Sequence, residues 1–141
     1  MITKILNGAT ALGACGKTNG ITSAEQLAAL FFSPQGREFC LKHNYPTIAM
    51  WREIEATIPN LEKLGFYIDA GAIELRNKEN IAIIGQTRCV AKFDENNSIF
   101  HTLALHGAKA TIHACNYAVF EAEADATSEV ETIKDKTAIR L

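Results

Sequence analysis

The sequence lacks the features that identify several large classes of protein. It has three prolines, one tryptophan and four cysteines, and no two cysteines form a C-x-x-C pair. The common zinc and redox-dithiol signatures are therefore absent. Because cysteine is among the residue types most often buried, we expect buried, free thiols in a reducing compartment.

Long apolar runs and a surplus of positive charge are also missing. No window approaches the run of about 20 apolar residues that a membrane helix needs, and the opening residues, "MITKILNG", carry no secretory pattern. We therefore expect no membrane segment and a cytoplasmic location. The 14 Lys and Arg are outnumbered by 16 Asp and Glu. A nucleic-acid backbone requires a basic surface, so we expect no such partner.

The remaining composition is that of a folded chain. Hydrophobic residues make up 48% and charged residues 21% of the 141 positions, which excludes disorder for most of the chain. The residue pattern changes near position 65. We therefore divide the chain into a flexible N-terminal segment (1–20), a helical part (21–65) and a β-rich part (66–141).

The helical part is predicted to contain three or four short helices. Ser23 is followed three residues later by a glutamine, which is the spacing of a capping box. Ser33 can cap a second helix that has Pro34 at its first position. Gly36 is expected to keep this second helix short, because glycine destabilises a helix interior. A third helix is expected within "PTIAMWREIEATIPN".

The β-rich part alternates with a period of two. From Ala108 to Ala126 the even-numbered positions are mostly alanine or another apolar residue, and the odd-numbered positions are mostly polar. One side of each strand is therefore expected to point inward. Asn116-Tyr117 is the natural place for a bend that keeps this alternation. Other short strands are separated by turn sequences such as "NKEN", "DENNS" and "KDK".

Alanine fills little volume, so an alanine-rich interior favours a narrow coil over a broad core. We predict an α+β fold in which an N-terminal cap of short helices precedes a C-terminal β-solenoid or β-roll. A small β-sandwich is the alternative. Sheet edges and solenoid ends must be covered, and the last strand, "TAIRL", has no polar tail. We therefore expect self-association, most simply as a dimer or trimer.

A phosphate-binding loop is suggested by Gly16, Lys17 and Thr18, which follow Ala11 at the spacing of the looser pattern. A working loop lies between a buried strand and a helix. Here Asn7-Gly8 breaks the preceding apolar stretch, and Asn19-Gly20 is a turn dipeptide. A degenerate P-loop NTPase is therefore only an alternative hypothesis.

His113 and Cys115 are two residues apart on the polar side of one strand, as in a hydrolase or a metal site. Glu121, Glu123 and Asp125 follow on the odd-numbered positions and form a solvated acidic strand face in the simplest interpretation. The alternatives are pairing with Lys109 and Arg88 or Lys92, or binding of a cation. No spacing matches a metal signature. We expect no catalytic residue, no metal and no cofactor.

A small anionic ligand is a further hypothesis. The side chains of Arg88, Lys92, Lys109 and His113 would form an electropositive groove, most readily at an oligomer interface. Aromatic rings would complete such a site by stacking on a base. The candidates for stacking are Tyr67 and Tyr117.

Four stretches, "FFSPQGREFCLKHNYPTIAMW", "YIDAG", "IAIIGQT" and "HGAKATIHACNYAVF", resemble an uncharacterised family of short proteins of gut bacteria and their prophages. The resemblance covers roughly residues 21–141. It implies no reaction and no catalytic residue. It does imply a setting in phages and mobile elements, where small proteins without enzyme motifs act by binding.

The sequence therefore predicts a non-enzymatic, homo-oligomeric binding protein that interacts with a host protein or a virion component. One alternative is a protein that sequesters a small anionic ligand, such as a host signalling nucleotide, in an anti-defence role. The other alternative is the degenerate P-loop NTPase.

Overall fold

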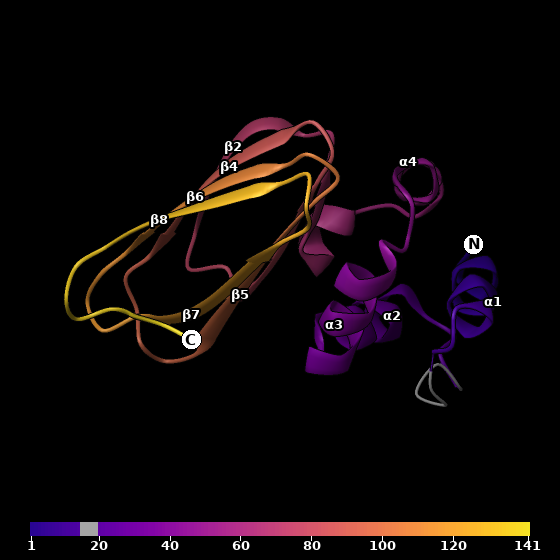
Figure 1. Ribbon diagram of the computed structural model, residues 1–141, viewed down its shortest axis with the longest axis horizontal. Coiled ribbons are helices and arrows are strands. Elements are labelled where there is room, and N and C mark those ends of the chain that lie inside the picture. Colours follow the sequence, from indigo (N-terminus) through magenta and orange to yellow (C-terminus); the bar gives the residue numbers. More distant parts are fainter. Residues whose placement is uncertain (15–19) are drawn as a thin grey trace. The chain divides into compact units, whose positions relative to one another are not determined.

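The computed structural model describes residues 1–14 and 20–141 and divides the chain into two compact units, Met1–Leu64 and Gly65–Leu141 (Figure 1). The first unit is helical. The second is a β-solenoid of parallel strands. The division falls one residue before the change of pattern in the sequence.

The first unit contains four α-helices and one 3-10 helix in its described part. They are α1 (Ile2–Ala11), α2 (Ala24–Phe32), α3 (Pro34–His43), α4 (Ile48–Thr57) and the 3-10 helix η2 (Leu61–Leu64). Ser23 begins α2 with the expected capping box, and the hydroxyl of Ser33 accepts from the backbone N–H of Gly36 at the start of α3. The aromatic rings of Phe31 and Trp51 meet edge to face in the interior of this unit.

Residues 2–11 of the segment expected to be flexible form the helix α1. This helix has no side-chain cap at its N-terminus and no acidic residue in its first turn. Contacts from distant residues hold it instead. The hydroxyl of Tyr45 donates to the carbonyl oxygen of Ile5 at 2.7 Å, and Lys4 pairs with Glu53 at 2.8 Å. Such contacts cannot be read from the local sequence.

Gly36 does not keep α3 short, because the helix runs for ten residues. A Cβ atom at position 36 would lie 2.0 Å from the carbonyl oxygen of Leu30 and 2.7 Å from that of Phe31. The glycine therefore permits the start of α3 to lie directly against the end of α2. Its role is a close backbone approach and not the ending of a helix.

The second unit contains nine strands in two parallel sheets. Sheet A has the order β1-β3-β5-β7-β9. Sheet B has the order β2-β4-β6-β8, which can be followed in Figure 1. The strands are β1 (Phe66–Ile68), β2 (Gly71–Arg76), β3 (Asn80–Ile84), β4 (Thr87–Phe93), β5 (Ile99–Leu105), β6 (Lys109–Ala114), β7 (Val119–Ala124), β8 (Glu129–Lys134) and β9 (Ile139–Arg140).

The chain alternates between the two sheets and so winds through about four coils. The register in sheet A pairs Phe66 with Ala82, Asn80 with His101, Ile99 with Val119, and Val119 with Ile139, so successive coils advance by 16, 21, 20 and 20 residues. All neighbouring strands are parallel, whereas sandwich sheets are antiparallel. The predicted solenoid is confirmed.

The interior of the solenoid is narrow, as the alanines indicated. Even-numbered residues from Ala108 to Ala122 are buried except at the bend, where Asn116 and Tyr117 both have positive φ angles. The largest fully buried side chains include three phenylalanine rings. Phe93 and Phe100 are stacked with ring centroids 4.4 Å apart, and Phe120 lies 6.0 Å from Phe93. These rings fill the middle of an otherwise alanine-rich core.

Thr102 buries a hydroxyl group without a hydrogen-bond partner in this core, and we expect its replacement by valine to raise the free energy of unfolding. Its side chain is 2% exposed, and its hydroxyl has no hydrogen-bond partner among the described residues. Thr102→Val replaces that hydroxyl with a methyl group of similar size. The free energy of unfolding should rise by about 1 kcal/mol, because an unsatisfied polar group is no longer buried. Urea denaturation followed by circular dichroism measures this change.

Thr87 provides a matched control, because it is equally buried but satisfied. Its hydroxyl accepts from the backbone N–H of Ala70 at 3.0 Å and lies 3.0 Å from the carbonyl oxygen of Ile84. Thr87→Val should therefore lower stability by about 1–3 kcal/mol. If both valine variants were destabilised alike, the hydroxyl of Thr102 would have to be satisfied in solution.

Candidate functional site

The outer face of sheet B is a flat array of exposed side chains. Alternate residues of its four strands point outward, and the parallel register aligns them in three columns across β2, β4, β6 and β8. The first column is Ala72, Arg88, Lys109 and Glu129; the second is Glu74, Val90, Thr111 and Glu131; the third is Arg76, Lys92, His113 and Ile133. All are exposed except Thr111, which is half-buried.

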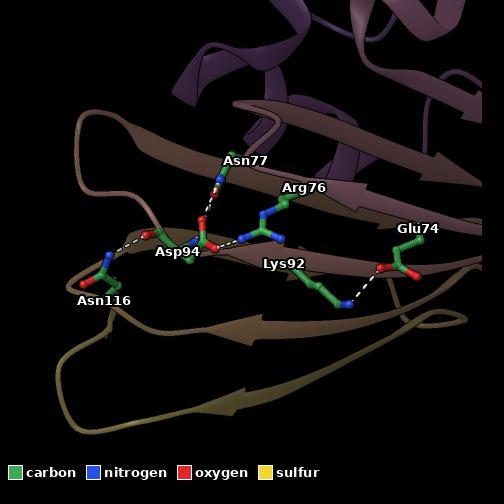
Figure 2. A network of polar contacts seen from close by, with 6 residues as sticks. All are labelled: Glu74, Arg76, Asn77, Lys92, Asp94 and Asn116. Carbon is green, nitrogen blue, oxygen red and sulfur yellow. Dashed lines mark hydrogen bonds and ion pairs between the residues drawn. The ribbon is translucent and has the colours of Figure 1, made fainter.

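This face brings together the four basic residues that the sequence analysis singled out. Arg88 lies directly opposite Lys109, and Lys92 lies directly opposite His113. Lys92 is paired with Glu74 at 2.8 Å (Figure 2), and the hydrogen bond from Lys92 lowers the pKa of the Glu74 carboxyl. Within the described residues, the side chains of Arg88 and Lys109 have no hydrogen bond or ion pair. Two like charges therefore face each other, and the acidic neighbour in their column is Glu129, which lies opposite Lys109 on β8.

The two tyrosines do not share this face. Tyr67 lies in β1 of sheet A, where its ring packs against the interior and the Lys78 ammonium lies 5.5 Å above it. Tyr117 is exposed in the turn between β6 and β7. Both positions depend on which sheet each segment joins, and the alternation of residues gives no information on this point.

The acidic residues that follow β6 also lie elsewhere. The chain crosses to sheet A after Cys115, so Glu121 and Glu123 face away from Lys109 and the other basic residues of sheet B. Glu121 lies beside His101, with 3.2 Å between its carboxylate and Nδ1. Asp125 accepts hydrogen bonds from the backbone N–H of His106 and from Thr127 in a turn. These acids therefore do not pair with the basic residues of sheet B.

A shallow groove of about 460 Å³ lies where β4, β6 and β8 end. Its polar lining is formed by Lys92, Asp94, His113, Cys115, Lys134 and Asp135. Lys134 and the two aspartates were not identified from the sequence. Asp94 and Asp135 occupy equivalent places two coils apart, with Cys115 at the equivalent place between them, and Lys134 precedes Asp135. A repeat length of about 20 residues would have been the signal for this alignment.

Asp94 organises the turns beside this groove (Figure 2). Its Oδ1 accepts from Nδ2 of Asn77 at 2.7 Å, and its backbone N–H donates to Oδ1 of Asn77 at 2.9 Å. Its carboxylate also pairs with Arg76, and Asn116 donates to its carbonyl oxygen at 2.9 Å. These bonds join three consecutive coils, so we assign Asp94 a structural role.

Two turn aspartates stabilise the solenoid more when they are ionised than when they are protonated. The hydrogen bond from Asn77 and the pairing with Arg76 hold the pKa of Asp94 below its ordinary value of 3.8. Hydrogen bonds from the hydroxyl and backbone N–H of Thr137 lower the pKa of Asp135 in the same way. Because these pKa values are depressed by folding, the unfolded chain binds protons first as the pH falls.

We therefore expect stability to be lost as the pH falls below 3.8 and through the lower pKa values of the folded state. Well above the ordinary pKa of 3.8, both aspartates are ionised in the folded and the unfolded chain, so they add no pH dependence to the stability. Asp135→Asn keeps an acceptor for the Thr137 hydroxyl and cannot titrate there, so its loss of stability between about pH 5 and about pH 3 should be smaller. Urea denaturation at a series of pH values provides the measurement. An equal loss in both proteins would contradict the role of Asp135.

The thiols differ in reactivity. Burial raises the pKa of Cys40 to about 12 and that of Cys89 to about 11, so neither is a thiolate near neutral pH. Cys115 is exposed and contradicts the expectation of buried thiols. It lines the groove with His113, but the described structure contains no hydrogen bond between them and no cluster of three metal-binding side chains. The arrangement lacks the paired base that a thiol nucleophile needs.

Gly16, Lys17 and Thr18 lie outside the described residues. The element before them is the helix α1, whereas a phosphate-binding loop follows a strand. Helix α1 therefore does not supply the structural context for that motif.

Comparisons with protein-family models, with curated proteins and with solved structures find no match to this chain. In the described part of the chain, none of the helices has the length and apolar character required to cross a bilayer. The assignment of a candidate site therefore rests on the geometry alone. Its two parts are the charged outer face of sheet B and the groove at the end of that sheet.

Proposed function

We propose that this protein is a non-enzymatic, homo-oligomeric binding protein that acts by protein interaction through the outer face of sheet B. One observation carries the proposal: Arg88 and Lys109 lie side by side and exposed, with no partner among the described residues. Like charges directly opposite each other destabilise a sheet. The repulsion between Arg88 and Lys109 would be relieved if the acidic surface of a bound partner neutralised both residues.

The solenoid suits this role because its strands fix the side chains before a partner arrives. The register of β2, β4, β6 and β8 sets the spacing of every column on the face. A preorganised surface loses less conformational entropy on binding than a flexible one. Val90 and Ile133 add large apolar side chains that are 36% and 49% exposed between the charges. Protein interfaces combine apolar and charged groups in this way.

The resemblance to short proteins of gut bacteria and prophages supports a setting for this interaction. In that setting the partner is a virion component or a host protein in the cytoplasm. Its contact surface is acidic at the point that meets Arg88 and Lys109. Binding should therefore weaken as the salt concentration rises, because exposed charges are screened over about 10 Å at 0.1 M salt.

Neutralisation of the basic pair tests the proposal. Arg88→Gln with Lys109→Gln removes two charges from the face, and Lys63→Gln with Lys136→Gln removes two exposed charges elsewhere. Affinity capture from extracts of the source cells, followed by quantitative mass spectrometry, should show a partner that binds the wild-type chain and the control. The same partner should be lost with the face variant. Equal capture by all three proteins would overturn the assignment to this face.

A second candidate function is sequestration of a small anionic ligand such as a signalling nucleotide. The observation that favours it is the groove of about 460 Å³, where Lys92, His113 and Lys134 lie together with the carboxylates of Asp94 and Asp135. This volume lies in the range of small-molecule sites, about 300–1,000 Å³. Native mass spectrometry of the freshly purified protein, followed by denaturation, should then release an intact nucleotide-sized mass. A nucleotide panel in a thermal-shift assay, with Lys134→Gln as the variant, provides the independent measurement.

A further inference from the structure

The outer face of sheet B carries acidic residues that match its basic ones. Glu129 and Glu131 are exposed on β8, which is the strand beside β6 at the edge of sheet B. Neither carboxylate has a hydrogen bond or ion pair with a described residue. Glu129 occupies the same column as Arg88 and Lys109. The face therefore presents two unpaired cations and two unpaired anions on adjacent strands.

This arrangement is self-complementary under a two-fold rotation. An axis midway between the two copies, parallel to the face and to the strands and near β6, places β8 of one copy on β4 or β6 of the other. Rotation about that axis keeps each residue in its own column. Glu129 of one copy then faces Arg88 or Lys109 of the other copy, and each such contact occurs twice. The two sheets remain nearly aligned, as in the usual packing of sheets face to face.

The remaining columns are compatible with the same arrangement. In the second column, Glu131 of one copy meets Val90 or Thr111 of the other, where the threonine hydroxyl is a hydrogen-bond donor. In the third column, Ile133 meets Lys92 or His113 and covers the stems of those side chains. Ile133 is half-exposed in the single chain, so the contact also removes apolar surface from water.

We propose that a second copy of this chain occupies the outer face of sheet B, in a two-fold dimer held by Glu129 against Arg88 and Lys109. The inference rests on the proposed function, because it describes the homo-oligomer formed by the same face. A second copy and an outside acidic partner compete for Arg88 and Lys109, so the dimer must dissociate before that partner binds. It adds an orientation to the expected self-association: the strands of the two copies are parallel to the axis, and β8 of each copy covers the basic residues of the other.

The size of the face sets the expected strength of the dimer. An axis near β6 leaves only β4, β6 and β8 in the overlap. Three strands about 4.8 Å apart, each with about six residues rising about 3.3 Å, give a flat area on the order of 300 Å² per copy. A standard stable interface buries about 800 Å² per partner. The dimer should therefore be reversible, with a dissociation constant in the micromolar range or weaker. It should dissociate as salt rises from about 50 mM to about 500 mM.

Charge exchange between copies tests the proposal directly. The first variant combines Arg88→Glu with Lys109→Glu, and the second combines Glu129→Lys with Glu131→Lys. Sedimentation equilibrium of the full chain at about 10–300 µM measures the association of each protein alone and of an equal mixture. Each variant alone should associate at least about tenfold more weakly than the wild type, and the mixture should recover a heterodimer.

Two additional double variants of the chain serve as controls. Lys63→Glu with Lys136→Glu reverses two exposed charges outside the face and should dimerise like the wild type. Arg88→Gln with Lys109→Gln weakens the contact without new repulsion inside one chain, which covers the case in which a charge-reversed variant fails to fold. Circular dichroism establishes that each protein is folded before its mass is measured.

Recovery of the heterodimer only in the mixture would support the proposal. A folded wild-type chain that stays monomeric at the highest concentration would overturn it. A dimer unaffected by either pair of substitutions, or variants that do not recombine, would overturn it as well. These failures leave the capture experiment for the proposed function intact, because loss of a different acidic partner from the Arg88→Gln, Lys109→Gln variant does not depend on self-association.

Discussion

Phe93→Ala is expected to lower the free energy of unfolding of the solenoid by about 3–5 kcal/mol. Phe93 is fully buried and stacks on Phe100 with 4.4 Å between ring centroids. Its other neighbours in the core include many alanines, whose side chains are too short to move into the space that the ring leaves. A cavity therefore remains, and its cost adds to the lost burial of the ring.

The measurement is urea denaturation of the full chain, followed by far-ultraviolet circular dichroism for the strands and by the fluorescence of Trp51 for the helical unit. Ile99→Ala is the matched control, because Ile99 is a large apolar residue of β5 that is 45% exposed. It should cost less than about 1 kcal/mol. A loss of the same small size in Phe93→Ala would mean that the coil collapses around the vacated space.

Gly36→Ala is expected to destabilise the helical unit, although helix propensity alone predicts a gain of about 1 kcal/mol. The added Cβ would lie 2.0 Å from the carbonyl oxygen of Leu30. That atom belongs to the backbone of α2 and cannot rotate away, so the two helices must separate. Overpacking of this kind typically costs about 1–3 kcal/mol, which exceeds the gain in propensity.

Trp51 is the only tryptophan and lies buried in the helical unit, so its fluorescence during urea denaturation reports this change. Gln35→Ala is the control, because Gln35 is the preceding residue in the first turn of α3 and is exposed. That substitution should leave stability unchanged or raise it slightly. An increase in the stability of Gly36→Ala would show that α2 and α3 have room to separate at no cost.

Local signals in the sequence were sufficient for much of the fold. The capping box of Ser23 fixed the start of α2, since its hydrogen bonds join residues three positions apart. The alternation from Ala108 onward gave the buried side of each strand, because successive side chains of a strand point to opposite faces. The positive φ angles at Asn116 and Tyr117 occur where that alternation required a bend. The four basic residues of the candidate site followed from the same rule.

Other features required contacts between residues distant in the sequence. Helix α1 was missed because Tyr45 and Glu53 hold it, and its own residues carry no capping signal. The groove residue Lys134 was missed because its neighbours come from other coils.

The sequence by itself determined where helices begin and which side of each strand is buried, because both depend on residues a few positions apart. Only the tertiary structure decided which sheet each strand joins. That choice separated Glu121 from Lys109 and placed Glu129 beside it. The physical reason is that neighbours in a parallel solenoid are one coil apart, about 20 residues along the chain, and the period of two contains no information about that distance.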